Sequence, residues 1–159
     1  MFPQLWVPSF YFLDQLFADL VELDVSSPFT GILEAVFMGL WVAPTPAPTP
    51  GLLMAGITEA TYTGYARQAV VWFPRGIDAL GRETMRAHNL NFTPSDSVTP
   101  NTITGVFLTD NATVGMGHLL LSAQLATPVA LNGASQSLNA KAVFQLPFTP
   151  IYGGVDVES

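Results

Sequence analysis

The chain has 159 residues, which is enough for one domain with its own hydrophobic core. It contains no cysteine, which excludes disulfides and thiolate metal sites. Charged residues make up only 11 % of the sequence, against about 25 % in an average soluble domain. Because so few charges must cover the surface, we expect part of that surface to be buried against other chains. The alternative is a monomer coated with Thr, Ser, Asn and Gln.

The formal net charge is −7, and its placement along the chain is uneven. No Lys or Arg precedes Arg67, whereas the acidic residues Asp14, Asp19, Glu22, Asp24, Glu34 and Glu59 do. The basic residues other than Lys141 are Arg67, Arg75, Arg82 and Arg86. Such a small basic set does not favour nucleic-acid binding. The acidic first part of one copy could instead face the Arg span of a neighbouring copy and set its register.

The first eight residues carry two prolines and two large aromatic residues, and we expect residues 1–8 to be an apolar arm without regular structure. The segment lacks the basic start of a secretory signal. Residues 9–24 are predicted to form an amphipathic helix with Ser9 as its N-cap. Its wide apolar face would pack on the domain's own sheet or on a partner protein. No uncharged apolar run reaches 18 residues, so we expect no membrane span.

Residues 29–42 form a nearly continuous apolar run, which predicts a strand covered on both faces, with bends at Gly31 and Gly39. Residues 43–51, APTPAPTPG, are predicted to be an ordered surface loop, with a polyproline arm as the alternative. Residues 58–73 are rich in Thr, Tyr and Val, which favours a central strand pair or one bent strand, with a bulge or bend at Gly64.

The second half of the chain is predicted to be a series of strands. Residues 74–81 read as a loop, and residues 82–93 as a strand whose alternation changes phase, which indicates a bulge near His88. Residues 102–109 and 118–125 predict a hairpin, and Asn132-Gly133 is a signal for a second one. Residues 137–146 alternate most clearly between apolar and polar side chains.

These elements predict a mainly β protein, an antiparallel β-sandwich of immunoglobulin-like or jelly-roll type with one N-terminal amphipathic helix. The whole chain, 1–159, would be a single domain with the sandwich over residues 29–146. The C-terminal tail, residues 147–159, would dock on the sandwich or on a neighbour, because it contains large apolar residues.

The sequence contains no pattern that predicts chemistry. It lacks a G-x-S-x-G element, a phosphate-binding loop and a dinucleotide-binding fingerprint. His88 and His118 do not have the spacing of a known metal site. A Ser-His-Asp site assembled in space, or a pair among Glu59, Glu83 and Asp110 for glycoside hydrolysis, would leave no sequence signature. We therefore expect no catalytic site, no metal and no cofactor.

Two stretches resemble segments of small β-sandwich proteins from tailed bacteriophages and viral metagenomes. They are TEATYTGYAR at residues 58–67 and NTITGVFLTD at residues 101–110, and the strand LLLSAQLATPV at residues 119–129 is similar to the family's next strand. The likeness covers roughly residues 31 to 146. It implies a component of the virion that is not an enzyme.

We therefore expect a structural protein of a phage virion, a capsid decoration, cement or minor capsid protein assembled in many copies in the host cytoplasm. Its partners would be the major capsid protein or other virion proteins and further copies of itself, with no nucleic acid and no membrane. The expected partner-binding residues are Phe2, Leu5, Trp6, Phe10, Phe12, Phe148, Ile151 and Tyr152. The alternative is a tail- or fibre-associated module that recognises host surface glycan through a cluster of Trp72, Phe73 and Tyr65.

Overall fold

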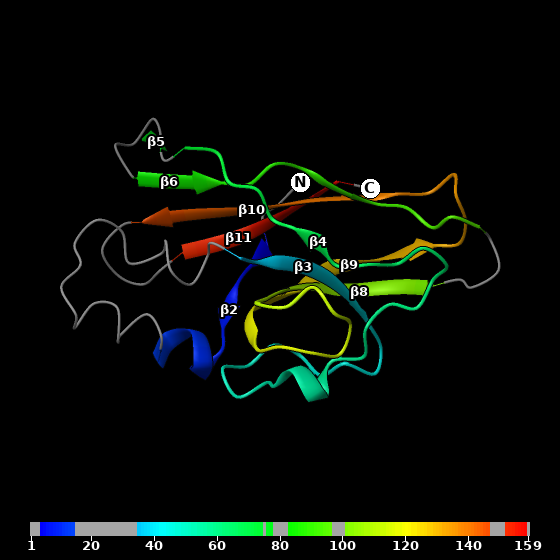
Figure 1. The fold of residues 1–159 in the computed structure, drawn as a ribbon, viewed down its shortest axis with the longest axis horizontal. Coiled ribbons are helices and arrows are strands. Elements are labelled where there is room, and N and C mark those ends of the chain that lie inside the picture. The colour runs from blue at the N-terminus through cyan, green and yellow to red at the C-terminus, as the bar shows by residue number, and fades with distance from the viewer. Residues whose placement is uncertain are drawn as a thin grey trace.

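The computed structural model describes residues 4–14, 35–74, 76–77, 83–96, 101–146 and 152–158 (Figure 1). It is mainly β, with 44 % of the chain in strands that form antiparallel sheets, which confirms the expected sandwich-like fold. The first sheet has the order β1-β11-β10-β6-β5, with β7 also paired to β10, and the second has the order β2-β9-β8-β3-β4. The strands of the first sheet are β1 (Gln4–Leu5), β5 (Gly76–Ile77), β6 (Glu83–Arg86), β7 (Leu90–Phe92), β10 (Leu138–Leu146) and β11 (Tyr152–Glu158). Those of the second are β2 (Val7–Pro8), β3 (Phe37–Val42), β4 (Gln68–Ala69), β8 (Asn101–Thr109) and β9 (Leu119–Leu131).

Strand β10 organises the first sheet, as its alternating sequence predicts. Leu138, Ala140 and Ala142 are buried in the main core. On one side β10 pairs with β11, so the C-terminal segment docks on the chain's own sandwich and is a strand rather than a tail. On the other side it pairs with β6 and then β7.

The break between β6 and β7 is the predicted bulge. Arg86 lies opposite Val143, and Leu90 lies opposite Ala140, so four steps along one strand match three along the other. The extra residue falls at positions 87–89 and restores an inward direction for Leu90, which is buried. The change of phase in the sequence thus located the irregularity correctly.

The predicted hairpin of the second sheet is confirmed by the pairing of β8 with β9. Strand β9 is longer than expected and continues to Leu131, because a large irregularity absorbs Pro128: Ile103 lies opposite Val129, whereas Gly105 lies opposite Gln124. The hairpin predicted at Asn132-Gly133 is wrong. Strands β9 and β10 belong to different sheets, so residues 132–137 connect the two layers.

The chain switches between the sheets at both sides of the sandwich. Residues 4–8, predicted to lack regular structure, instead form β1 on the first sheet and β2 on the second. Pro8 is compatible with this placement because β2 lies at the end of its sheet, where a missing N–H is tolerated. The four end strands, β1, β5, β2 and β4, are each two residues long.

Residues 58–73 are not the predicted central strand pair. They form only β4 and two isolated bridges, Glu59 with Trp41 and Trp72 with Ala87, and they carry the chain from the second sheet to the first. Gly64 has a φ of +87° and lies in a turn, so of the two predicted alternatives the chain bends there and has no strand bulge. The neighbouring residues 74–81, expected to be a loop, include the short strand β5, which pairs with β6.

The strand predicted over residues 29–42 is present as β3, which begins only at Phe37: residues 35–36 are not in a strand, and residues 29–34, with the bend expected at Gly31, lie outside the described residues. Strand β3 is buried on both faces, as its continuous apolar sequence predicts. Met38 and Leu40 face the main core, whereas Trp41 belongs to a second cluster with Leu52, Met54, Phe107 and Leu119. Gly39 and Gly105 make this second layer possible rather than bending the strand. A Cβ atom would lie 2.3 Å from the Phe107 ring at Gly39 and 2.1 Å from the Trp41 ring at Gly105.

An irregular segment covers the outer cluster. The predicted proline-rich loop, residues 43–51, is an ordered, largely exposed loop that leads into the 3-10 helix η1 (Met54–Gly56). Residues 10–14 are helical, and the Ser9 hydroxyl accepts the N–H of Phe12 at 3.1 Å, which confirms the predicted N-cap. Residues 15–24 of the predicted helix lie outside the described residues. Among the described residues, no helix is long and apolar enough to cross a membrane.

Candidate docking site

A pocket of about 280 Å³ lies in the outer layer of the second sheet. Three segments that are distant in sequence form it: the start of the helix, the end of the proline-rich loop with η1, and the β8–β9 turn. Its lining residues are Ser9, Phe10, Tyr11, Pro50, Gly51, Leu52, Leu53, Met54, Ala55, Gly117, His118 and Leu119. The lining is mostly apolar, which makes the pocket suited to an apolar group.

Hydrogen bonds from the helix start fix the walls of the pocket. The Ser9 N–H donates to the Leu120 carbonyl at 2.9 Å, and the Ser9 hydroxyl donates to the Leu119 carbonyl. The Phe10 N–H donates to the Pro50 carbonyl at 2.9 Å. The helix start is therefore tied both to β9 and to the proline-rich loop, and the pocket lies between them.

Large apolar side chains are exposed in the lining of this pocket and in the β8–β9 turn that supplies part of the lining. We define the pocket face as Phe10, Leu53, Val114 and Met116, whose exposed fractions are 62 %, 70 %, 49 % and 57 %. Phe10 and Leu53 line the pocket, and Met116 directly precedes Gly117 in its lining. Single exposed apolar residues are ordinary on protein surfaces, but several that meet at a pocket mark an interaction site.

The residues that the sequence predicted to bind a partner differ in their exposure in the structure. Phe10 is exposed on the pocket face, whereas Trp6 and Phe12 are buried in the main core, at 6 % and 1 % exposure. Those two side chains hold the chain's own fold and have no surface to offer a partner. Leu5 and Tyr152 lie in the first sheet. Leu5, in β1, pairs with Gly154, and Tyr152, in β11, pairs with Gln145. Phe2, Phe148 and Ile151 lie outside the described residues.

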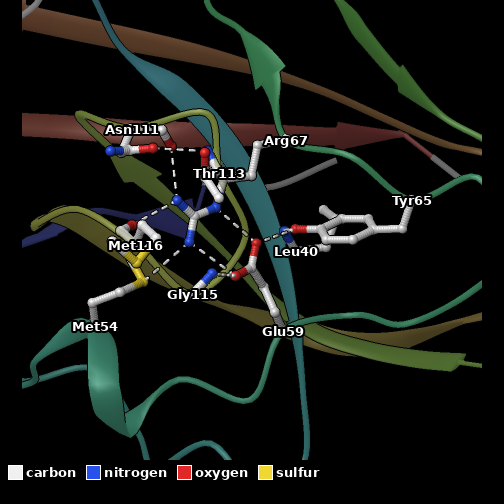
Figure 2. A network of polar contacts seen from close by, with 9 residues as sticks. All are labelled: Leu40, Met54, Glu59, Tyr65, Arg67, Asn111, Thr113, Gly115 and Met116. Carbon is white, nitrogen blue, oxygen red and sulfur yellow. Dashed lines mark hydrogen bonds and ion pairs between the residues drawn. The ribbon is translucent and has the colours of Figure 1, made fainter.

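Beneath the pocket face lies a buried network of polar side chains (Figure 2). Arg67 Nε and Nη2 donate to the two oxygens of Glu59 at 2.8 Å and 2.9 Å, which is a bidentate ion pair. The Arg67 side chain is fully buried, and that of Glu59 is 8 % exposed. The guanidinium also lies 5.4 Å from the centre of the Phe107 ring, a distance at which cation–π attraction operates.

The same network holds the turn between β8 and β9. Arg67 Nη1 donates to the carbonyls of Asn111 and Met116 at 2.7 Å and 2.8 Å. Glu59 Oε2 accepts the N–H of Gly115 at 3.0 Å, and Arg67 Nη2 also contacts the sulfur of Met54 at 3.5 Å. All five N–H groups of the guanidinium therefore have partners, as a buried arginine requires. The network fixes the backbone from which Val114 and Met116 project.

Tyr65 completes the network on the side of β3. Its hydroxyl donates to Glu59 Oε1 at 2.8 Å and accepts the Leu40 N–H at 3.0 Å. Burial, followed by the charge of Glu59, raises the pKa of Tyr65 far above its ordinary value. Since this hydroxyl is used inside the fold, Tyr65 does not join Trp72 and Phe73 in the aromatic cluster predicted for glycan binding.

Ser9, His118 and Asp110 have the residue types of a hydrolase triad but not its hydrogen bonds. His118 Nδ1 lies 2.8 Å from Asp110 Oδ2. The Ser9 proton, however, is donated to the Leu119 carbonyl, so the hydroxyl is an N-cap and not a nucleophile prepared by histidine. The His118 ring instead stacks on Tyr11 with ring centres 4.0 Å apart. Within the described residues, no group of three or more His, Asp or Glu side chains could hold a metal ion.

Burial of the Asp110 carboxylate raises its pKa, but hydrogen bonds from the backbone N–H and the ring of His118 outweigh this effect, so the pKa of Asp110 is lower than usual. The backbone nitrogen of His118 lies 2.7 Å from Asp110 Oδ1, to which its N–H donates. These bonds fix the end of the turn next to the pocket.

Sequence reasoning missed Leu53, Val114 and Met116 as surface residues and missed the network entirely. The three apolar residues lie in irregular segments, where no periodicity distinguishes an inward side chain from an outward one. The only available signal was that apolar residues occur in turn sequences, as in the stretch TVGMG at residues 113–117.

Comparison of the chain with protein-family models, with curated proteins and with solved structures found no match. The geometry of the pocket face and the sequence are therefore the grounds for a functional proposal.

Proposed function

We propose that this chain is a structural protein of a phage virion, of the capsid decoration, cement or minor capsid kind, that acts by docking on other virion proteins. The observation that carries the proposal is the pocket face, where Phe10 and Leu53 expose apolar surface at the pocket and Val114 and Met116 expose it in the adjoining β8–β9 turn. An interface core is depleted in charge and enriched in aromatic residues and methionine, and this face fits that description.

The low charge content of the chain supports the same function. With 11 % charged residues, the protein resembles a subunit that functions within an assembly more than one that stays dispersed. Two of the three acids considered for glycoside hydrolysis have partners within the fold: Glu59 is neutralised by Arg67, and Asp110 is bonded to His118. The resemblance to small phage β-sandwich proteins adds the kind of assembly, a virion.

The glycan-binding alternative has weaker support. It requires an aromatic platform at one end of the sandwich, and Tyr65 is withdrawn from that platform by its bonds to Glu59 and Leu40.

The test is to count copies of this chain in particles purified from bacteria infected by the phage that encodes it. In the Leu53→Asp variant, a charge is placed on the pocket face, and we expect at least a tenfold loss of copies per particle, measured by quantitative mass spectrometry. The Ala130→Ser variant, changed at an exposed position of β9, is the control and should be incorporated normally. Absence of the wild-type chain from purified particles, or equal incorporation of Leu53→Asp, would contradict the proposal.

A further inference from the structure

A second exposed patch lies on a short two-stranded ribbon, whose residues are not among those that line the pocket. The Phe73 N–H donates to the Arg86 carbonyl and the His88 N–H donates to the Val71 carbonyl, each at 2.8 Å, on either side of the bridge between Trp72 and Ala87. Residues opposite each other in such a pair point to the same face. We define the ribbon patch as these four outward residues, Val71, Phe73, Arg86 and His88.

The ribbon patch offers an aromatic ring to a partner. Phe73 and Val71 have exposed fractions of 48 % and 56 %, whereas Ala87 on the inward face is 2 % exposed. One side of the Phe73 ring stacks on His88, with ring centres 3.8 Å apart. The stack fixes the ring's orientation, so little side-chain entropy remains to be lost when it is bound.

The size of the pocket fits one such ring. Its volume of about 280 Å³ lies just below the range of roughly 300–1,000 Å³ typical of small-molecule sites. Interface hot spots, by contrast, are often single aromatic side chains that fill small apolar pockets. An aromatic side chain from another protein is therefore a better occupant than a free metabolite.

Charges beside the two patches are complementary. Asp14 is exposed and lies one helical turn from Phe10, at the i,i+4 spacing that places two side chains on the same face of a helix. Arg86 is exposed and lies opposite Phe73 on the ribbon. Each patch thus combines an aromatic residue with one charge, negative at the pocket and positive at the ribbon.

From this match, and on the proposed function's premise that the pocket face is a docking face, we infer that copies of this chain associate head to tail. Phe73 of one copy enters the pocket beside Phe10 and Leu53 of the next, and Arg86 pairs with Asp14. The patches lie on different elements, with β6 at the top of Figure 1 and η1 at the bottom. A contact between two different surfaces leaves one unused patch at each end of a dimer, so it can continue into a ring or a row.

Sedimentation velocity of the full chain over a range of concentrations tests this contact. We expect the wild type to form dimers and larger species, and Phe73→Ser and Leu53→Arg each to remain monomeric. A mixture of these two variants should form a one-to-one dimer and nothing larger, because one intact ribbon patch and one intact pocket remain. A wild type that stays monomeric, or a mixture that stays monomeric, would overturn the inference.

Charge exchange tests the register. Asp14→Arg and Arg86→Asp should each weaken association on the order of tenfold, and the double variant should restore it. Thr127→Arg, at an exposed position of β9, adds a cation without touching either patch and should have no effect. Failure of the double variant to recover association would overturn the pairing of Arg86 with Asp14. Particle incorporation is measured separately: wild-type incorporation without self-association would refute the head-to-tail contact and leave the proposed function intact.

Discussion

The two sides of the β8–β9 turn have opposite chemistry. On the inner side the charged residues Glu59 and Arg67 are buried, and on the outer side the apolar residues Val114 and Met116 are exposed. The inner side has its hydrogen bonds satisfied within the fold, whereas the outer side leaves apolar area in water. The difference shows that polar interactions hold this region in shape, which allows its apolar side chains to remain available for binding.

Replacement of Arg67, on the inner side of the turn, should cause the largest loss in the free energy of unfolding. In Arg67→Met the Glu59 carboxylate stays buried without its partner, and breaking a buried pair in this way costs about 3–5 kcal/mol. Urea denaturation should show a loss of that size. The double variant Glu59→Leu/Arg67→Met removes both charges and should be more stable than Arg67→Met alone; a double variant that is less stable would contradict this account.

Gly117→Ala should be the next most damaging change, because it distorts the turn itself. Gly117 has a φ of +87°, and a Cβ atom there would lie 2.5 Å from Asn111 Cβ and 2.6 Å from Asp110 Oδ1. Backbone strain and overpacking together should cost about 2–4 kcal/mol. Gly115→Ala is a matched control: it has a similar φ of +78° with nothing near the added atom, so thermal unfolding should show a smaller loss.

Tyr65→Phe should weaken the network without leaving a charge unpaired. The Leu40 N–H would lose its acceptor and Glu59 one of its donors, at a cost of about 1–2 kcal/mol. Tyr62→Phe, at a buried tyrosine whose pKa is raised by burial alone, is the control. An equal effect of the two substitutions in urea denaturation would show that the hydroxyl of Tyr65 contributes nothing specific.

Alkaline pH should destabilise the folded protein, because its buried tyrosines ionise less readily than those of the unfolded chain. Burial raises the pKa of Tyr62 to about 12, against about 10 in the unfolded chain. The unfolded chain therefore loses this proton first, so the stabilising contribution is complete below pH 10 and falls as the pH rises toward 12. Urea midpoints measured from pH 8 to 11 should decline at the upper end, and less steeply in Tyr62→Phe. A decline of the same steepness in this variant would contradict the assignment.

The smallest effect on stability is expected on the outer side. Leu53→Ser replaces a side chain that is 70 % exposed, so the free energy of unfolding should change by no more than about 0.5 kcal/mol. The same change should nevertheless reduce binding, measured by sedimentation velocity or by particle incorporation. A large loss of stability would show that Leu53 serves the fold, and the contrast between the two sides of the turn would disappear.

The sequence predicted elements whose signal is local. The alternation of residues 138–146, the bulge between β6 and β7, the β8–β9 hairpin and the Ser9 cap depend on neighbouring residues, and all are present. The sandwich itself follows from the number and kind of strands. Residues 58–73 were misjudged because Thr, Tyr and Val favour strands in general. This segment is instead held by groups distant in sequence, such as the Asn101 side chain, whose Oδ1 accepts the N–H groups of Thr61 and Tyr62.

The docking site was predictable only at Phe10. Phe10 was one of several apolar residues near the start of the chain that we expected to bind a partner, but nothing in the sequence distinguished it from Phe12, which is buried. The direction of each side chain depends on how the helix start is bonded to β9 and to Pro50, which are more than thirty residues away. The pocket and the network are long-range features and required the structure.

The two-residue strands at the ends of both sheets have a consequence for the proposed assembly. Long exposed edges act as templates for backbone pairing between molecules, which leads to fibres and precipitates. Here each terminal strand is only two residues long, and β1 and β2 interrupt the longer edges of β11 and β9. If copies assemble as proposed, contacts between them would therefore be made mainly by side chains, which can be reversed and corrected.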